Sequence, residues 1–208
     1  MVETFCSKLT LKIRTKMPEI DDERAEVINY GLQLLIGEVP KTIILIVIAY
    51  LFGALKLTVV ALLALLPYRT VSGGVHLNTH IGCIIATSLF YTGNAVISKY
   101  LVIGTNIRYL ITFFIWVFAM IMIKLYAPAD TEAVPILRKK ERQIKKILSY
   151  IIMTISLGIS VVINNMVIAN ILMFGVLFQT TTITRMMYKI TGNKFGYEEY
   201  IKSSNQNK

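Results

Sequence analysis

The sequence predicts an all-α integral membrane protein with about six transmembrane helices. Of its 208 residues, 55% are hydrophobic and only 16% are charged, whereas soluble domains carry about 25% charged residues. Apolar runs also recur along the whole chain, and a spanning helix needs roughly 20 such residues. Few charges together with repeated apolar runs exclude an ordinary soluble domain.

Six runs are candidate spans, and the second is short. In chain order they begin at residue 39 or 42 and end at 55, then cover 57–66, 81–97, 109–126, 147–163 and 166–184. Residues 57–66 reach membrane length only by continuing through Pro67, Arg69 and the pair Gly73–Gly74. We therefore expect a second span that breaks or ends at this level. Non-helical backbone survives there only if protein buries it or it lines a wet cavity.

The net charge of +10 follows the connections between the spans. Basic residues concentrate in residues 1–16, 138–146 and 185–202, which indicates membrane orientation rather than nucleic-acid binding. Six spans with both termini inside place all three segments in the cytoplasm, together with the connection 69–83. The predicted organisation is a single membrane domain, with an amphipathic N-terminal region (1–38), a bundle (39–184) and a basic cytoplasmic tail (185–208).

Residues 19–36 are expected to form an amphipathic helix capped by Asp21 or Asp22. Its apolar face, Ala25 to Leu35 at helical spacing, either packs on the bundle or the lipid headgroups or receives another amphipathic helix. The two cysteines cannot form a disulfide framework. A reduced thiol facing the cytoplasm is the simpler expectation.

The connection between the second and third spans holds the candidate chemistry. It contains Arg69, both histidines and Cys83, and ionisable groups at membrane depth are functional candidates by default. A thiol is a poor nucleophile until it loses its proton, and a nearby imidazole can take that proton. A helix beginning near residue 79 would also favour the Cys83 thiolate through its dipole. Arg69 could stabilise this thiolate, bind a substrate carboxylate or anchor the span at the headgroups.

Spacing alone favours His80 as the base, because it lies three residues before Cys83 on a helix. His76 lies seven residues before Cys83, and two helical turns separate their backbones by ~10.5 Å. That is too far for a hydrogen bond of ~3 Å. His76 becomes a possible base if the chain bends, with Gly73–Gly74 or Gly82 supplying the freedom. It also becomes possible if a loop folds it back over a helix that begins near residues 78–79.

Three other functions fit this connection less well than thiol chemistry does. His76, His80 and Cys83 could supply zinc ligands, but neither a neighbouring carboxylate nor a further cysteine supports a metal site, so we expect no metal and no cofactor. A non-catalytic transporter or channel-like protein would use the polar break as a pathway, but would not need thiol and imidazole together. A structural or sensor component without chemistry is the other alternative.

Two separated motifs resemble those of the accessory gene regulator B (AgrB) family of Gram-positive bacteria. The first is R-x3-G-G-x-H-x6-C, which is Arg69, Gly73, Gly74, His76 and Cys83 here. The second is YAPADTE at residues 126–132, followed by Pro135 and a basic run. The resemblance implies a membrane cysteine endopeptidase, with Cys83 as nucleophile and His76 as base.

In that family the enzyme cuts the C-terminal part from an AgrD-type precursor peptide, and the product cyclises to a thiolactone or lactone. The resemblance also implies a homodimer. Asp130 in the second motif could orient the histidine or shape the turn. The cations Arg138, Lys139, Lys140 and Arg142 could bind anionic lipid or hold the precursor's acidic tail.

Overall fold

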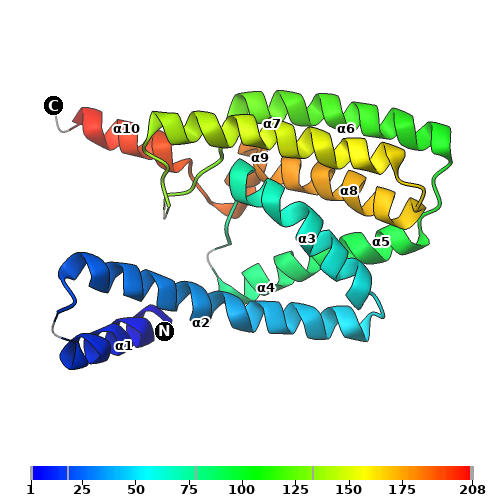
Figure 1. The fold of residues 1–208 in the computed structure, drawn as a ribbon. Helices are drawn as coiled ribbons and strands as arrows, with labels where there is room; N and C mark the ends of the chain where they lie inside the picture. Colours follow the sequence, from blue (N-terminus) through cyan, green and yellow to red (C-terminus); the bar gives the residue numbers. More distant parts are fainter. Residues whose placement is uncertain (1, 18, 78, 133, 207–208) are drawn as a thin grey trace. The chain divides into compact units, whose positions relative to one another are not determined.

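The computed structural model describes residues 2–17, 19–77, 79–132 and 134–206, and the regular structure in these ranges is helical (Figure 1). The chain divides into two compact units, residues 1–48 and 49–208. The helices are α1 (Val2–Lys16), α2 (Asp22–Leu51), α3 (Leu55–Ser72), α4 (His80–Ser88), the π-turn η1 (Leu89–Gly93), α5 (Asn94–Tyr100), α6 (Thr105–Tyr126), α7 (Lys139–Val162), α8 (Met166–Thr182), α9 (Arg185–Thr191) and α10 (Gly196–Gln206).

Within the described ranges, five segments are long and apolar enough to cross a membrane. They are Arg24–Leu51, Leu55–Ser72, Ile81–Tyr100, Thr105–Tyr126 and Lys139–Val162. A sixth is obtained if α8 and α9, which are bent by 68° at a short break, count as one span. The chain is therefore a multi-pass membrane protein, and the predicted fold class is confirmed.

The first unit holds α1 and most of α2. A helix was expected over 19–36 and a separate span from residue 39 or 42, but the structure has one continuous helix, Asp22–Leu51, with Pro40 inside it. The expected separation is thus wrong, because a proline inside a helix removes one hydrogen bond and need not end it. The helix ends at Leu51, and in the turn that follows Gly53 has a φ of 61°, while Ala54 N–H donates to Ala49 O (2.9 Å).

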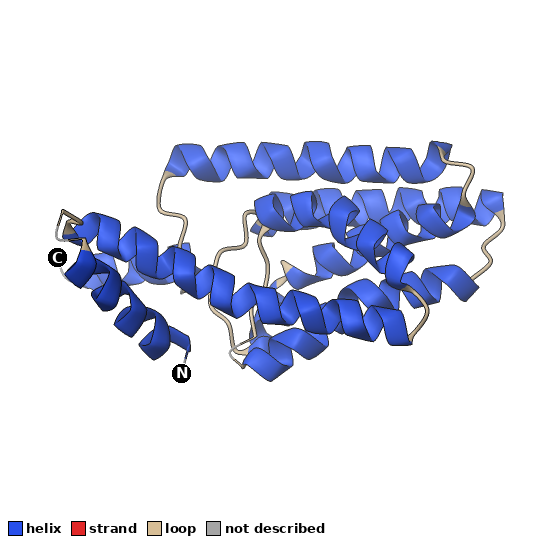
Figure 2. Cartoon of the chain, turned by 60° about the horizontal axis from the view of Figure 1, so that its bottom comes forward, coloured by secondary structure: helices blue, strands red, loops and turns tan. Residues whose placement is uncertain are grey.

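The second unit is a bundle built around α8. This helix contacts α3, α5, α6 and α7, and Figure 2 shows the helices of the bundle lying along one another. Close packing against α3 depends on Gly175, since a Cβ there would overlap the Leu65 side chain. Tyr68 Oη and Thr180 Oγ1 share a buried hydrogen bond (2.9 Å). These contacts place the end of α8 beside the end of α3.

The second and third spans carry the motif between them. The second runs unbroken through Pro67 and ends at Gly73, whose N–H donates to Arg69 O (3.0 Å), as predicted. The third was expected as a plain helix over 81–97, but it contains the π-turn Leu89–Gly93. After the turn Asn94 is buried, and its Nδ2 donates to Ile171 O on α8 (3.0 Å).

Candidate functional site

The chain leaves α3 through two glycines that no other residue could replace without strain. Gly73 has φ 72° and Gly74 has φ 131°, a region that favours glycine. A Cβ on Gly73 would overlap the carbonyl of Ala129. A Cβ on Gly74 would lie 2.5 Å from Thr182 Oγ1 and 2.6 Å from Arg69 Nη1. The predicted break at this pair is confirmed.

The two separated sequence motifs meet at these glycines. Gly74 N–H donates to Ala129 O (2.8 Å), and Ala129 N–H donates to Ser72 O (2.8 Å). The two chain segments form an isolated parallel β-bridge between Gly73 and Ala129. The 126–132 segment therefore holds the glycine pair in place through main-chain hydrogen bonds.

The end of α8 holds the glycine pair from the other side. The buried amide of Gln179 donates from Nε2 to Ser72 Oγ (2.9 Å) and to Gly73 O (2.8 Å). One turn further, Thr182 O accepts the N–H of Val75 (3.1 Å). Residues 72–75 are thus fixed by two elements far away in the sequence.

The guanidinium of Arg69 is aimed into the connection. Among the described residues, it donates to Val75 O (2.7 Å), Thr182 Oγ1 (3.0 Å) and Gln179 Oε1 (3.4 Å). All three acceptors are neutral, so these bonds leave the positive charge without a compensating carboxylate.

His76 follows in an extended segment with its side chain exposed. Its backbone is bound on both sides by one residue of the C-terminal segment. Asn193 Nδ2 donates to His76 O (2.7 Å), and His76 N–H donates to Asn193 Oδ1 (3.4 Å). The histidine therefore lies between the glycine break and the next helix, tied to a residue 117 positions away.

Cys83 lies at the end of the first turn of α4. Thr79 caps this helix, since its Oγ1 accepts the N–H of Gly82 (3.1 Å), and Thr79 O accepts the N–H of Cys83 (2.9 Å). Of the arrangements that the sequence left open, the structure therefore has the one in which a helix begins near residue 79. The thiol is free and half-buried. The side chain of His80 lies outside the described part of the structure, so the choice between the two histidines stays a prediction.

Asp130 joins three elements. Its fully buried side chain accepts at Oδ2 from Arg142 Nη1 (2.9 Å), Ile136 N–H (2.9 Å) and Tyr197 N–H (3.1 Å). Its main-chain oxygen accepts from the hydroxyl of Tyr188 (3.0 Å). The sequence left two roles open for Asp130, to orient the histidine or to shape the turn. These contacts fit the second role.

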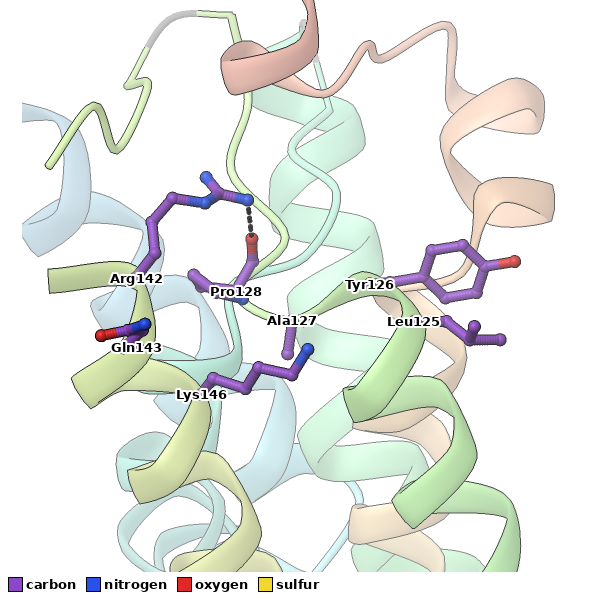
Figure 3. A pocket seen from close by; sticks show the side chains of 7 residues that line it. All are labelled: Leu125, Tyr126, Ala127, Pro128, Arg142, Gln143 and Lys146. Carbon is purple, nitrogen blue, oxygen red and sulfur yellow. Dashed lines mark hydrogen bonds between the residues drawn. The ribbon is translucent and has the colours of Figure 1, made fainter. Parts of the chain in front are cut away.

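The basic run at the start of α7 divides into two kinds of residue. Arg142 is engaged: besides Asp130, it donates to Pro128 O (3.3 Å), and its guanidinium lies 4.4 Å from the ring centre of Tyr197. Arg138, Lys139 and Lys140 are exposed. Figure 3 shows Arg142 at the rim of a pocket between the end of α6 and α7, lined by Leu125, Tyr126, Ala127, Pro128, Arg142, Gln143 and Lys146.

The described side chains contain no group of three His, Cys, Asp or Glu residues that could hold a metal ion.

Sequence reasoning missed Gln179 and Asn193, which both contact the motif. A signal existed for each. Gln179 interrupts an apolar run, and polar residues inside a span are functional candidates. Asn193 directly follows Gly192, which is a typical residue after a helix end.

Comparison with known proteins agrees with these motifs. The family model described as "Accessory gene regulator B" matches residues 6–183. A "Putative AgrB-like protein" of Clostridium acetobutylicum is 28% identical over 181 residues, covering 85% of each chain. A second of that name from Listeria monocytogenes serotype 4a is 28% identical over 188 residues, covering 86% of this chain and 87% of its own. "Accessory gene regulator protein B" of Staphylococcus epidermidis is 29% identical over 161 residues, covering 77% and 80%. No solved structure matches.

Proposed function

Because the chain belongs to the accessory gene regulator B family, we propose that it is a membrane cysteine endopeptidase that processes the precursor of a quorum-sensing peptide. One observation carries the proposal. The half-buried thiol of Cys83 lies in the first turn of a capped helix, seven residues after His76, whose backbone Asn193 holds. A helix dipole favours the thiolate at this place, and an imidazole that reaches the thiol would take its proton.

The first step is acyl transfer to sulfur. His76 takes the proton of Cys83, and the thiolate attacks the scissile carbonyl carbon of the precursor. The tetrahedral intermediate collapses as the carbon–nitrogen bond breaks. The imidazolium gives its proton to the leaving amine, so the C-terminal fragment departs and the rest of the precursor stays on Cys83 as a thioester.

The second step closes the ring. A thiol or hydroxyl within the bound peptide attacks the thioester, so that a new sulfur or oxygen ester forms and Cys83 leaves as a thiolate that regains the proton. Water must be excluded for this attack to outrun hydrolysis, and a site at the membrane surface offers that shelter. Main-chain N–H groups at the start of α4, other than those of Gly82 and Cys83 that Thr79 accepts, supply donors for the oxyanion, and Arg69 supplies positive charge in the same connection.

The precursor's acidic C-terminal part meets a basic surface. We assign this contact to the exposed side chains of Arg138, Lys139 and Lys140, because Arg142 is already engaged by Asp130. The positive-inside pattern places both termini and the site on the cytoplasmic side of the cell membrane. Membrane lipid, an AgrD-type precursor and a second copy of the chain are the proposed partners, in a Gram-positive host.

Parallel substitutions test this function. Cys83→Ser and His76→Ala, each co-expressed with the precursor at matched protein level, should abolish release of the C-terminal fragment. His80→Ala, treated in the same way, decides which imidazole is the base. Cys6→Ser is the matched control, because Cys6 is buried in the first unit, and it should cleave as the unmodified protein does. Fragment release by Cys83→Ser would refute the peptidase function.

A further inference from the structure

The segment after α8 folds back onto the motif instead of leaving the bundle as a free tail. α9 ends at Gly192 in the left-handed conformation (φ 69°). Gly192 N–H donates to Lys189 O (3.4 Å), and Asn193 N–H donates to Tyr188 O (2.9 Å). This pair of bonds is a Schellman motif, which fixes the direction of the chain just past a helix. The main chain of Asn193 is therefore fixed by its own helix end.

This helix end is itself anchored to the 126–132 segment. The Tyr188 hydroxyl donates to Asp130 O (3.0 Å), and the Tyr188 ring stacks on Phe195 with 4.0 Å between centroids. Two residues on, Tyr197 N–H donates to the buried carboxylate of Asp130 (3.1 Å). Gly196 lies so close to Thr131 O that a Cβ there would overlap it. Asn193 is thus held from both sides.

The side chain of Asn193 presents one donor and one acceptor to the backbone of His76. Nδ2 donates to His76 O (2.7 Å), and Oδ1 accepts from His76 N–H (3.4 Å). Among side chains, only the amides of asparagine and glutamine offer both groups side by side in one plane. A third contact, from Nδ2 to Thr191 Oγ1 (2.8 Å), fixes the amide orientation.

His76 needs such an anchor because it lies in neither helix. Its predecessors are each fixed by another element, Gly74 by Ala129 and Val75 by Thr182, and Asn193 extends this series to residue 76. A general base has to lie within about 3 Å of the proton it removes, and small misplacements of a catalytic group cost large factors in rate. Backbone anchoring therefore controls where the imidazole can reach.

We propose that Asn193 is a positioning residue for His76, so that the C-terminal segment, which lies beyond the residues matched by the family model, is part of the catalytic apparatus. The proposal rests on the proposed peptidase function. It assigns Asn193 no contact with substrate; the residue acts by holding the backbone of the base.

Full-length protein in lipid vesicles, with purified precursor, provides the test. Asn193→Ala should lower kcat for cleavage about tenfold, as expected for losing ordinary hydrogen bonds at the base, and leave KM unchanged. Asn193→Gln, which keeps both polar groups, should recover part of the rate. Lys194→Ala is the matched control, because Lys194 is the next residue and its exposed side chain pairs with Glu132. It should cleave normally.

A second measurement separates positioning from general folding. In a Cys6→Ser background, the rate of Cys83 alkylation by iodoacetamide against pH reports thiolate formation. Asn193→Ala should move this profile to higher pH, between the unmodified protein and His76→Ala. Arg69 is kept in every variant.

The outcomes are distinct. Unchanged kcat in Asn193→Ala, or a lowered kcat with an alkylation profile identical to that of the unmodified protein, overturns the positioning role. Cleavage by Cys83→Ser refutes the proposed function itself, whatever Asn193→Ala does. Full activity of His76→Ala shows that His76 is not the base, which overturns the positioning role of Asn193 and leaves the peptidase function standing.

Discussion

At the scale of single residues, the buried carboxylate of Asp130 has the clearest structural role. It pairs with Arg142 and accepts two main-chain N–H groups, while its side chain has no exposed surface. Removing one partner of a buried pair leaves the other charge uncompensated, which costs far more than the pair itself contributes. Asp130 therefore governs whether the 126–132 segment keeps its shape.

Asp130→Ala should destabilise the protein by about 3 kcal/mol, since it leaves Arg142 and two N–H groups without their acceptor. Asp130→Asn, which keeps an acceptor oxygen, should cost less. Thermal unfolding in detergent measures both. Glu132→Ala, in the exposed pair with Lys194, is the control and should leave the unfolding temperature unchanged. Equal effects of Asp130→Ala and Glu132→Ala would contradict the role of the buried pair.

The glycine pair gives a second prediction at this scale. Gly73→Ala and Gly74→Ala should each abolish cleavage, because both residues have positive φ and the added Cβ meets Ala129, or Thr182 and Arg69. Gly158→Ala is the control: its Cβ would meet nothing within 4 Å in the middle of α7, and alanine is the better helix former. Precursor cleavage at matched expression measures all three, and an active Gly73→Ala protein would contradict the close approach of the two motifs.

The sequence predicted the candidate catalytic residues but not the residues that hold the segment around them. Cys83 and His76 belong to a compact motif, and the type of each residue suggests its chemistry. Gln179 and Asn193 contact that motif across more than 100 residues. Such contacts depend on how helices pack, and local spacing carries no information about them.

At the scale of elements, the start of α4 matters most. It was predictable because threonine is a good cap, and the end of α3 was predictable from the glycines. The continuous α2 was not, because its first half is amphipathic and its second half is largely apolar, a pattern typical of two separate helices. The π-turn at residues 89–93 was also missed, since one extra residue in a turn is set by packing, here by Asn94 against α8.

Thr79→Val should destabilise α4 by about 1 kcal/mol, as expected for loss of a side-chain cap, and should lower cleavage because Cys83 lies in the first turn. Thr79→Ser keeps the hydroxyl that accepts from Gly82 N–H and should stay close to the unmodified protein. Unfolding temperature and cleavage rate are measured together. Equal behaviour of the two variants would show that the cap does not support the nucleophile.

At the scale of the whole molecule, the distribution of charged and apolar residues along the chain is the feature that the sequence predicts best. Composition was enough to predict a multi-pass membrane protein, because low charge and long apolar runs are global properties. The return of the C-terminal segment to the motif was not predictable: the segment is rich in lysine, yet its aromatic residues Tyr188 and Phe195 stack and anchor it. The boundaries of the predicted regions 1–38 and 185–208 stay predictions.

Replacing Arg138, Lys139 and Lys140 together by glutamate should lower kcat/KM about tenfold on an acidic precursor, through weaker association. Added salt should lower cleavage by the unmodified protein and change the variant little or in the opposite direction. A precursor whose acidic residues are replaced by glutamine is the control, and the variant should lose no efficiency on it. Equal losses on both precursors would restrict these cations to membrane anchoring.

The central claim is that Cys83 carries the peptide as a thioester. The most direct measurement uses a precursor that lacks its ring-closing thiol or hydroxyl, acid quenching, and mass spectrometry of the protein. The account predicts an adduct with the mass of the N-terminal part, less water, on Cys83, sensitive to hydroxylamine and absent in His76→Ala. Stoichiometric release of the C-terminal fragment with Cys83 unmodified throughout would contradict it.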